Sequence, residues 1–170
     1  MYFGRSLSFR TITRLNQPDI RRATSEDVAQ ILALESNFEE NDRLSRDSLR
    51  RLLRVPSADC LVADSGRVTG AAILLYRKGV QTARLYSISV SVDAGGQGIG
   101  RALIAAAKQV ACDRDCLRLR LEVRKSNARA ISLYERTGFK VIGRKDHYYD
   151  DGEDALIMQL DLTCQKKDKS

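Results

Sequence analysis

The sequence predicts one domain of mixed α/β, or α+β, architecture. Short runs in which apolar and polar residues alternate recur from residue 20 to residue 162, and segments with the helical spacing of apolar residues lie between several of them. Two strand patterns in the first half are joined by a short turn at residues 65–67, which is typical of a hairpin and not of a regular doubly wound sheet. A chain of 170 residues is long enough for one domain with its own core.

The first half of the predicted domain contains three strands and two helices. Thr24 or Ser25 is placed to cap a helix whose stripe at helical spacing runs from Val28 to Glu35. Pro56 ends the second helix, because proline cannot continue one. In chain order we expect a strand at 20–23, a helix from 24 or 25 to about 35, a helix from 45 to 56, and strands at 60–64 and 68–76.

The second half alternates strands with helices. Residues 117–124 form the clearest strand pattern, in which apolar and charged residues alternate so that Glu122 shares a face with Arg120 and Arg124. Asn127 is a typical cap for the short helix that follows, and Gly138 is a typical left-handed stop. We expect a strand at 83–92, an amphipathic helix from 99 to about 110, a strand at 117–124, a helix from 127 to near 138, and strands at 139–143 and 155–162.

The chain carries a net charge of +7 and a pI of about 9.4. This surplus favours acidic partners, which include nucleic acid, a phosphorylated cofactor or an acidic peptide, but it is also compatible with a surface that is merely rich in arginine. Nucleic-acid binding is disfavoured because there is no Trp and the Tyr and Phe residues do not interleave with the basic ones. No apolar run approaches the roughly 18 residues of a membrane span.

The cysteines and the single histidine limit the possible chemistry. Cys60, Cys112, Cys116 and Cys164 form no Cys-x-x-Cys pair, and Cys112 and Cys116 are interpreted as two small buried residues at a helix end. This cysteine usage, together with the lack of a continuous apolar stretch in residues 1–16, predicts a cytoplasmic protein. Because His147 is the only histidine, a metal site with several histidines is excluded and we expect no metal.

Residues 95–100, Gly-Gly-Gln-Gly-Ile-Gly, lie between a predicted strand and a strongly amphipathic helix. Glycines let the backbone approach a ligand, and the first amides of a helix have no partner inside the helix, so this segment is suited to bind phosphate. The pattern is neither Gly-x-Gly-x-x-Gly nor a Walker A loop. The spacing alone does not identify the phosphate compound.

Six motifs, in order and at matching spacings, resemble the GCN5-related N-acetyltransferases, and most closely the branch that acetylates the N-terminal alanine of a ribosomal protein. The motifs are Ser87-Ile88-Ser89-Val90, Gly98-Ile99-Gly100-Arg101-Ala102-Leu103, Leu121-Glu122-Val123-Arg124, Ser126-Asn127-Ala128, Leu133-Tyr134-Glu135 with Gly138-Phe139, and Tyr148-Tyr149 through Ala155. The resemblance implies a central, mostly antiparallel sheet of six to seven strands with a splayed parallel pair and about four flanking helices. Residues 1–17 show no clear periodicity and are expected to be an N-terminal extension that is partly mobile, residues 18–163 a single N-acetyltransferase domain, and residues 164–170 a polar tail.

The same resemblance implies a site that uses acetyl-CoA as cosubstrate and no metal. Glu122 matches the family's general base and Tyr134 its general acid. The residues that match its cofactor-binding positions are Ile88, Ser89, Val90, Gly96, Gln97, Gly98, Ile99, Gly100, Arg101 and Asn127. The first place of the family's phosphate loop, normally Gln or Arg, is Gly95, so we expect Gln97 or Arg101 to compensate. Residues 35–44 also depart from the aromatic Phe-Pro-Trp-like segment of the ribosomal-protein enzymes.

The function expected from this resemblance is transfer of an acetyl group from acetyl-CoA to an amine, in first place the N-terminal α-amine of a protein. A lysine side chain or a small amine such as a polyamine is the alternative acceptor, which the acidic residues Glu39, Glu40 and Asp42 would favour if they faced the acceptor. A non-catalytic acetyl-CoA-binding module is the alternative of another class. No membrane partner is expected.

Overall fold

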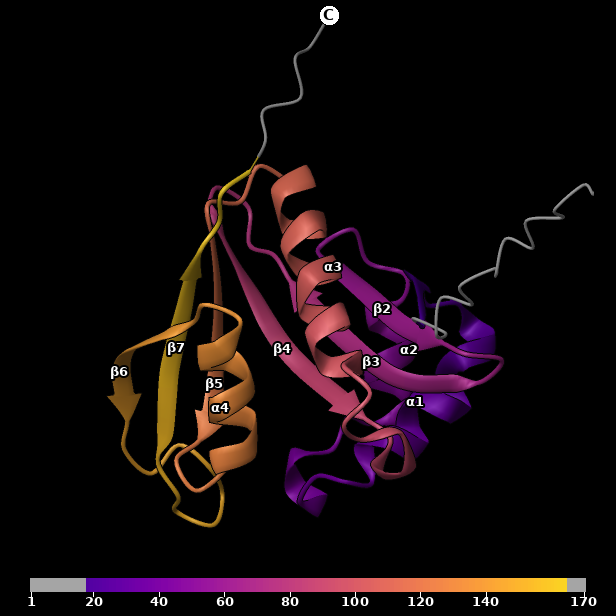
Figure 1. The fold of residues 1–170 in the computed structure, drawn as a ribbon, viewed down its shortest axis with the longest axis horizontal. Helices are drawn as coiled ribbons and strands as arrows, with labels where there is room; N and C mark the ends of the chain where they lie inside the picture. Colours follow the sequence, from indigo (N-terminus) through magenta and orange to yellow (C-terminus); the bar gives the residue numbers. More distant parts are fainter. Residues whose placement is uncertain (1–17, 165–170) are drawn as a thin grey trace, which may run out of the picture.

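A computed structural model describes residues 18–164, which form a seven-stranded sheet of order β1-β2-β3-β4-β5-β7-β6 flanked by helices (Figure 1). This confirms the predicted fold class. Residues 1–17, and all of the expected tail except Cys164, lie outside the described residues. The elements are β1 (Asp19–Arg22), η1 (Ser25–Asp27), α1 (Val28–Glu35), η2 (Glu40–Asp42), α2 (Arg46–Leu52), β2 (Ala58–Asp64), β3 (Val68–Leu75), β4 (Thr82–Val90), η3 (Val92–Ala94), α3 (Ile99–Asp113), β5 (Arg118–Arg124), α4 (Ala128–Arg136), β6 (Lys140–Lys145) and β7 (Ala155–Asp161).

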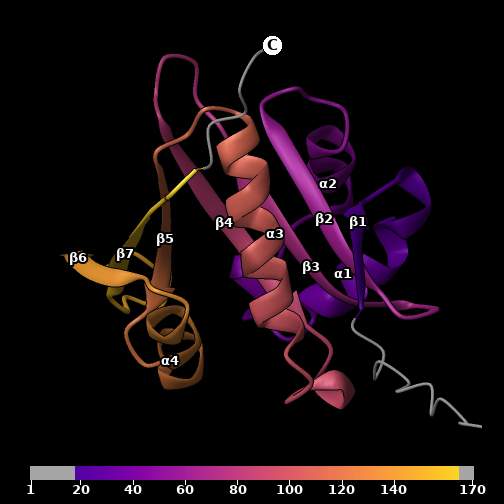
Figure 2. The same ribbon diagram turned by 45° about the horizontal axis from the view of Figure 1, so that its top comes forward.

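The sheet is antiparallel except at its centre, where β4 and β5 run parallel and pair over only three positions, 82–84 with 118–120. Just beyond them β4 has a bulge, because Leu74 pairs with Leu85 but the next residue back, Ile73, pairs with Ser87. Tyr86 is therefore an extra residue, and extra residues bend and twist a strand. From this point β4 and β5 diverge, as both views show (Figures 1 and 2).

Helices cover both faces of the sheet and create two cores. α3 and α4 lie on one face and α1 and α2 on the other (Figure 1). Because β2 is covered on both faces, six of its seven residues are buried, whereas β5 alternates buried Leu119, Leu121 and Val123 with charged residues. The alternation predicted for residues 117–124 is thus confirmed, and it places Glu122 and Arg124 on the sheet face opposite α3.

Several element boundaries differ from the prediction: the second helix ends at Leu52 and not at Pro56, β2 begins at Ala58 and not at Cys60, and β4 ends at Val90 and not at Val92. The first helix starts as the 3-10 turn η1, because the Asp27 carboxylate accepts a hydrogen bond from the Thr24 amide at 2.8 Å and pairs with Arg21. β6 begins at Lys140 rather than at Phe139, because the Phe139 ring is buried against the Tyr134 ring instead of lying on the sheet edge.

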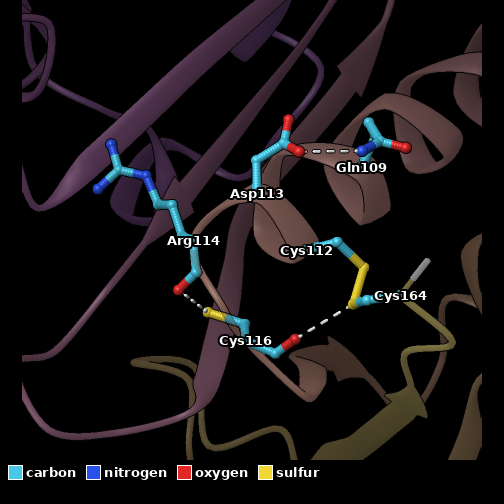
Figure 3. The surroundings of a disulfide bond; sticks show 6 residues. All are labelled: Gln109, Cys112, Asp113, Arg114, Cys116 and Cys164. Atoms are coloured by element: carbon cyan, nitrogen blue, oxygen red, sulfur yellow. Dashed lines mark hydrogen bonds between the residues drawn. A yellow bond between two sulfur atoms is a disulfide. The ribbon is translucent and has the colours of Figure 1, made fainter. Parts of the chain in front are cut away.

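The expectation that Cys112 is only a small buried residue is wrong, because Cys112 forms a disulfide with Cys164 (Figure 3). Cys112 lies in the last turn of α3, and Cys164 follows β7, which returns antiparallel to β5 and reaches the same end of the sheet. There the Leu162 amide donates to the Leu117 carbonyl at 2.9 Å. Cys116 is buried and free, as expected. The helical spacing of Cys112 and Cys116 gave no information about a partner in a distant strand.

Candidate active site

A cleft of about 500 Å³ opens where β4 and β5 diverge. Its walls come from the segment after α1, from β4, β5 and α4, and from the loop between β6 and β7. The cleft brings together both residues predicted to be catalytic, Glu122 from β5 and Tyr134 from α4. Within residues 18–164, no group of three or more His, Cys, Asp or Glu side chains is arranged to hold a metal ion.

Glu122 lies between two cations. The Arg84 Nε atom donates to Glu122 Oε2 at 3.0 Å, and the Lys145 Nζ atom donates to Glu122 Oε1 at 3.0 Å. The Glu122 side chain is only 12% exposed. Arg84 also donates to the Tyr148 hydroxyl at 3.0 Å. These contacts fix the carboxylate at the cleft wall.

The Tyr134 side chain is buried in α4, and its ring packs against Phe139 at 5.7 Å between ring centroids. Burial raises the pKa of the Tyr134 phenol above its ordinary value, because the charged phenolate is poorly solvated there. The phenol therefore keeps its proton at neutral pH and is suited to donate it.

A second carboxylate in the cleft, Glu35, was not predicted as a site residue. It ends α1 and is 3% exposed; the Ser87 hydroxyl donates to Oε1 at 2.9 Å and the Leu44 amide to Oε2 at 3.2 Å. Burial raises the pKa of Glu35, although both hydrogen bonds oppose the rise. The signal was present in the sequence, since Glu35 continues the otherwise apolar stripe of α1.

Arg124 connects the two loops that flank the cleft. Its guanidinium donates to Asp42 of η2 at 2.6 Å, and to Asp151 and Glu153 of the β6–β7 loop at 2.7 and 2.9 Å. It also lies over the Tyr149 ring, 4.0 Å from the centroid. Of the acidic run considered as an attraction for a cationic acceptor, only Asp42 lines the cleft, and Arg124 already neutralises it. Glu39 and Glu40 are exposed and take no part in the lining.

The edge of β4 that faces β5 has no strand partner beyond Arg84 among the described residues. Ile88, Ser89 and Val90, predicted to bind the cofactor through their backbone, lie in this stretch and pair with β3 on the other side only. Ile88 lines the cleft. The Ser89 hydroxyl is buried without a hydrogen-bond partner within residues 18–164, on the face of Ala71 and α1.

The glycine loop has the geometry expected for an anion site. Gly96 and Gly98 have φ angles of 77° and 76°, which L side chains rarely adopt, and Gly98 caps α3 without offering a side chain. The Ala102 amide is the first to bond back to the loop, at 2.9 Å to the Gly98 carbonyl. The amides of residues 96–101 have no acceptor in the described part of the chain. Six unpaired donors at the positive end of a 15-residue helix are suited to bind phosphate.

The remaining predicted cofactor residues are divided between exposed and structural positions. Gln97 and Arg101 are exposed, whereas the Ile99 side chain is in the core. Gly100 lies so close to α4 that an added Cβ would be 2.9 Å from Leu133 Cδ2. Asn127 caps α4 by accepting from the Ala130 amide at 3.1 Å, and it lines the cleft.

A splayed parallel pair, a glycine loop with unpaired amides and a cleft with a carboxylate and a buried phenol are the features that an acyltransferase using a CoA thioester needs. The sequence profile of the Acetyltransferase (GNAT) family matches residues 25–139, which is more than half of the chain. The chain belongs to this family, and the protein is an N-acetyltransferase. Members of the family use acetyl-CoA as acyl donor.

Relatives and solved structures agree with this assignment. A Bacillus subtilis (strain 168) protein, provisionally named [ribosomal protein bS18]-alanine N-acetyltransferase, is 31% identical over 145 residues, which cover 84% of this chain and 95% of that protein. The enzyme of that name from Escherichia coli (strain K12) is 40% identical over 96 residues, or 55% of this chain and 65% of that protein. The crystal structure of the Escherichia coli ribosomal-protein-S18-alanine N-acetyltransferase matches with a TM-score of 0.75 and 28% identity, over 91% of this chain and 99% of that chain.

Proposed function

We propose that the protein transfers the acetyl group of acetyl-CoA to the N-terminal α-amine of a protein. The observation that carries this proposal is the cleft at the divergence of β4 and β5, in which Glu122 and Tyr134 face the same space. The α-amine is favoured because relatives that align over most of this chain are named for acetylating an alanine of ribosomal protein bS18.

The residues present fit acetyl-CoA. The unpaired amides of residues 96–101 would hold its pyrophosphate. The edge of β4 at residues 88–90 has no strand partner, although the Val90 carbonyl accepts from Asn37 Nδ2 at 3.2 Å, and it would accept the pantetheine arm in the manner of an added strand. Asn127 lines the cleft. When bound, acetyl-CoA supplies a thioester whose carbonyl carbon is attacked by the amine nitrogen and whose sulfur leaves as thiolate.

Glu122 and Tyr134 would carry the two proton transfers. The acceptor amine must be neutral to attack, so Glu122 takes its proton, directly or through a water molecule. Arg84 and Lys145 hold this carboxylate at the cleft wall. Tyr134, which keeps its proton at neutral pH, donates to the departing thiolate. As the C–N bond forms and the C–S bond breaks, the nitrogen releases its second proton to solvent, and the Tyr134 phenolate left by protonation of the thiolate regains a proton from solvent.

The charge of the cleft supports a monocationic acceptor such as an α-amine more than a polyamine. Glu35, Asp42, Glu122 and Asp150 supply negative charge, but Arg43, Arg84 and Arg124 line the same cleft. A polycation would meet three guanidinium groups there, whereas a single amine needs only one carboxylate, such as Glu35, whose partners within residues 18–164 are a hydroxyl and an amide.

The acceptor is tested with a panel of substrates. Purified protein and acetyl-CoA are incubated with peptides that have a free N-terminal amine, with N-terminally blocked peptides that contain lysine, and with spermidine, and thiol release is recorded. We expect turnover of the first set only. Turnover confined to spermidine or to blocked peptides would overturn the α-amine assignment, and CoA binding without any transfer would indicate a binding module.

The catalytic pair is tested with Glu122→Gln and Tyr134→Phe. Each change removes one proton transfer, so kcat should fall by about 10²–10⁴-fold while CoA affinity, measured by calorimetry, stays close to that of the wild type. Glu135→Gln, an exposed carboxylate on α4, is the matched control. Wild-type kcat in both variants would contradict the proposed roles.

We also propose that residues 18–163 form a single N-acetyltransferase domain and that the protein acts in the cytoplasm. A ribosomal-protein substrate would be met there, as the names of the relatives suggest. Cytosolic thiols are kept reduced, so the Cys112–Cys164 pair would exist there in its dithiol form for part of its lifetime. Among the described residues, no helix has the length and apolarity that a membrane crossing requires.

A further inference from the structure

The backbone conformation at Gly95 does not require a glycine. Its φ and ψ angles, −62° and 146°, are extended values that any residue adopts, unlike the positive φ angles of Gly96 and Gly98. The absence of a side chain at Gly95 leaves space that a neighbouring group can occupy. A Cβ atom built at Gly95 would lie 3.0 Å from the Nη2 atom of Arg129 and 3.2 Å from the Val92 carbonyl oxygen.

The group that occupies this space comes from another element. Arg129 belongs to the first turn of α4, and its guanidinium lies beside the loop at the point where the family pattern has Gln or Arg. Gln97 and Arg101, the residues expected to compensate, have no atom within 4 Å of the Cβ position. That expectation gains no support from the structure.

The packing of α4 on α3 explains how Arg129 reaches the loop. Leu133 contacts Gly100 in the first turn of α3 so closely that a Cβ there would be 2.9 Å from Leu133 Cδ2. Residues 129 and 133 are one helical turn apart and therefore share a face of α4. The contact that fixes Leu133 on α3 thus directs Arg129 toward the preceding loop.

Arg129 has no hydrogen bond or ion pair within residues 18–164, and its side chain is exposed. Its neighbours are the unpaired amides of residues 96–101 and the positive end of the α3 dipole. A guanidinium held next to a helix N-terminus is unfavourable unless an anion lies between them. Arginine donates two parallel hydrogen bonds to phosphate, which makes it the residue type suited to that anion.

We infer that Arg129 binds the pyrophosphate of the cofactor, opposite the amides of the glycine loop, and replaces the Gln or Arg that Gly95 lacks. This inference rests on the proposed use of acetyl-CoA. It makes α4 part of the phosphate site, so residues of both α3 and α4 would contact the cofactor.

The test measures binding rather than turnover. Calorimetry with CoA and 3′-dephospho-CoA compares the wild type with Arg129→Ala, and competition by pantetheine reports the arm without phosphates. We expect the variant to bind both nucleotides roughly 10–100-fold more weakly, as the loss of a charge-assisted hydrogen-bond pair implies, and to bind pantetheine like the wild type. A loss seen with CoA but not with 3′-dephospho-CoA would assign Arg129 to the 3′-phosphate and overturn the inference.

Two further variants exclude a general effect of charge or folding. Arg136→Ala removes a cation from the other end of α4 and should leave CoA affinity unchanged. Adding Gly95→Gln to Arg129→Ala should recover much of the lost affinity, and a double variant as weak as Arg129→Ala would refute a shared site. If the wild type binds CoA and Arg129→Ala binds it equally well, the inference fails and the proposed function stands. If the wild type binds no CoA, the proposed function fails.

Discussion

Glu35 shows how a single buried carboxylate couples the cleft to the stability of the domain. It is held by a hydroxyl from β4 and an amide from the segment after η2, and it lies among the apolar residues of α1. A carboxylate that is poorly solvated in the native state is protonated more easily there than in the unfolded chain. Its ionisation at neutral pH therefore costs stability.

The pH dependence of Glu35→Gln follows from this raised pKa. The favourable contribution of Glu35 is fully present below its ordinary pKa and is lost as the pH rises through the raised native value. The unfolding free energy of the wild type minus that of Glu35→Gln should therefore decrease between about pH 4 and pH 8. Urea denaturation across this range measures it. Glu26→Gln, an exposed carboxylate in η1, is the control, and a difference that rises with pH would contradict the burial argument.

At the residue scale, the sequence was sufficient to predict site residues that belong to a motif within one continuous segment. Glu122 and Tyr134 were predicted from local motifs, and both line the cleft. The groups around them were missed, because Arg84 and Lys145 come from strands 38 and 23 residues away from Glu122. Their convergence depends on tertiary packing, which no single window of sequence contains.

At the element scale, Arg124 determines how the two cleft loops lie relative to each other. Among residues 18–164, Arg124 is the only side chain that forms ion pairs with carboxylates of both η2 and the β6–β7 loop. The pKa of Glu153 is lowered to about 2 by the hydrogen bonds that its carboxylate accepts, from Ser126 first and from Arg124. Glu153 therefore stays ionised throughout the neutral pH range.

Arg124→Gln should impair the acceptor and not the cofactor. Without the guanidinium, Asp42, Asp151 and Glu153 are like charges without a cation between them, and the two loops separate. We expect kcat/KM for the acceptor peptide to fall by about 10–100-fold, mainly through KM, as for other losses of positioning. CoA affinity by calorimetry should not change. Arg120→Gln is the control, because Arg120 lies on the same strand face but, within residues 18–164, its side chain bonds only to Gln159. A loss confined to CoA binding would refute the assignment.

The elements themselves were predictable wherever periodicity was strong. The alternation of β5 and the amphipathic pattern of α3 gave both elements nearly residue for residue. The start of the first helix and the start of β6 were predicted less accurately. The first depends on the hydrogen bond of the Asp27 side chain and the second on the burial of Phe139. The bulge at Tyr86, which separates β4 from β5, has no sequence signature in this chain.

At the scale of the whole molecule, the sheet consists of two halves with a short connection. Three residue pairs join β4 to β5, and the disulfide adds a covalent bond at the same end. The disulfide closes a loop with a sequence separation of 52 residues, which reduces the freedom of the unfolded chain. The splayed parallel pair was expected from the family resemblance, but the disulfide partner was not predictable, since it depends on segments far apart in sequence meeting at one end of the sheet.

Cys112→Ser should lower the unfolding free energy by about 2–4 kcal/mol in the absence of reductant. Urea denaturation measures the change, and adding dithiothreitol to the wild type should produce the same loss. Dithiothreitol should have no effect on the variant. Equal stability of wild type and variant without reductant would show that the disulfide does not form in solution.

Because of its position, this disulfide should affect the stability of the enzyme and not its turnover rate. Glu122 lies five residues along β5 from Leu117, or roughly 17 Å from the strand end where the cross-link is made. Oxidising conditions should then prolong the life of each enzyme molecule against heat and proteolysis while leaving its turnover unaltered.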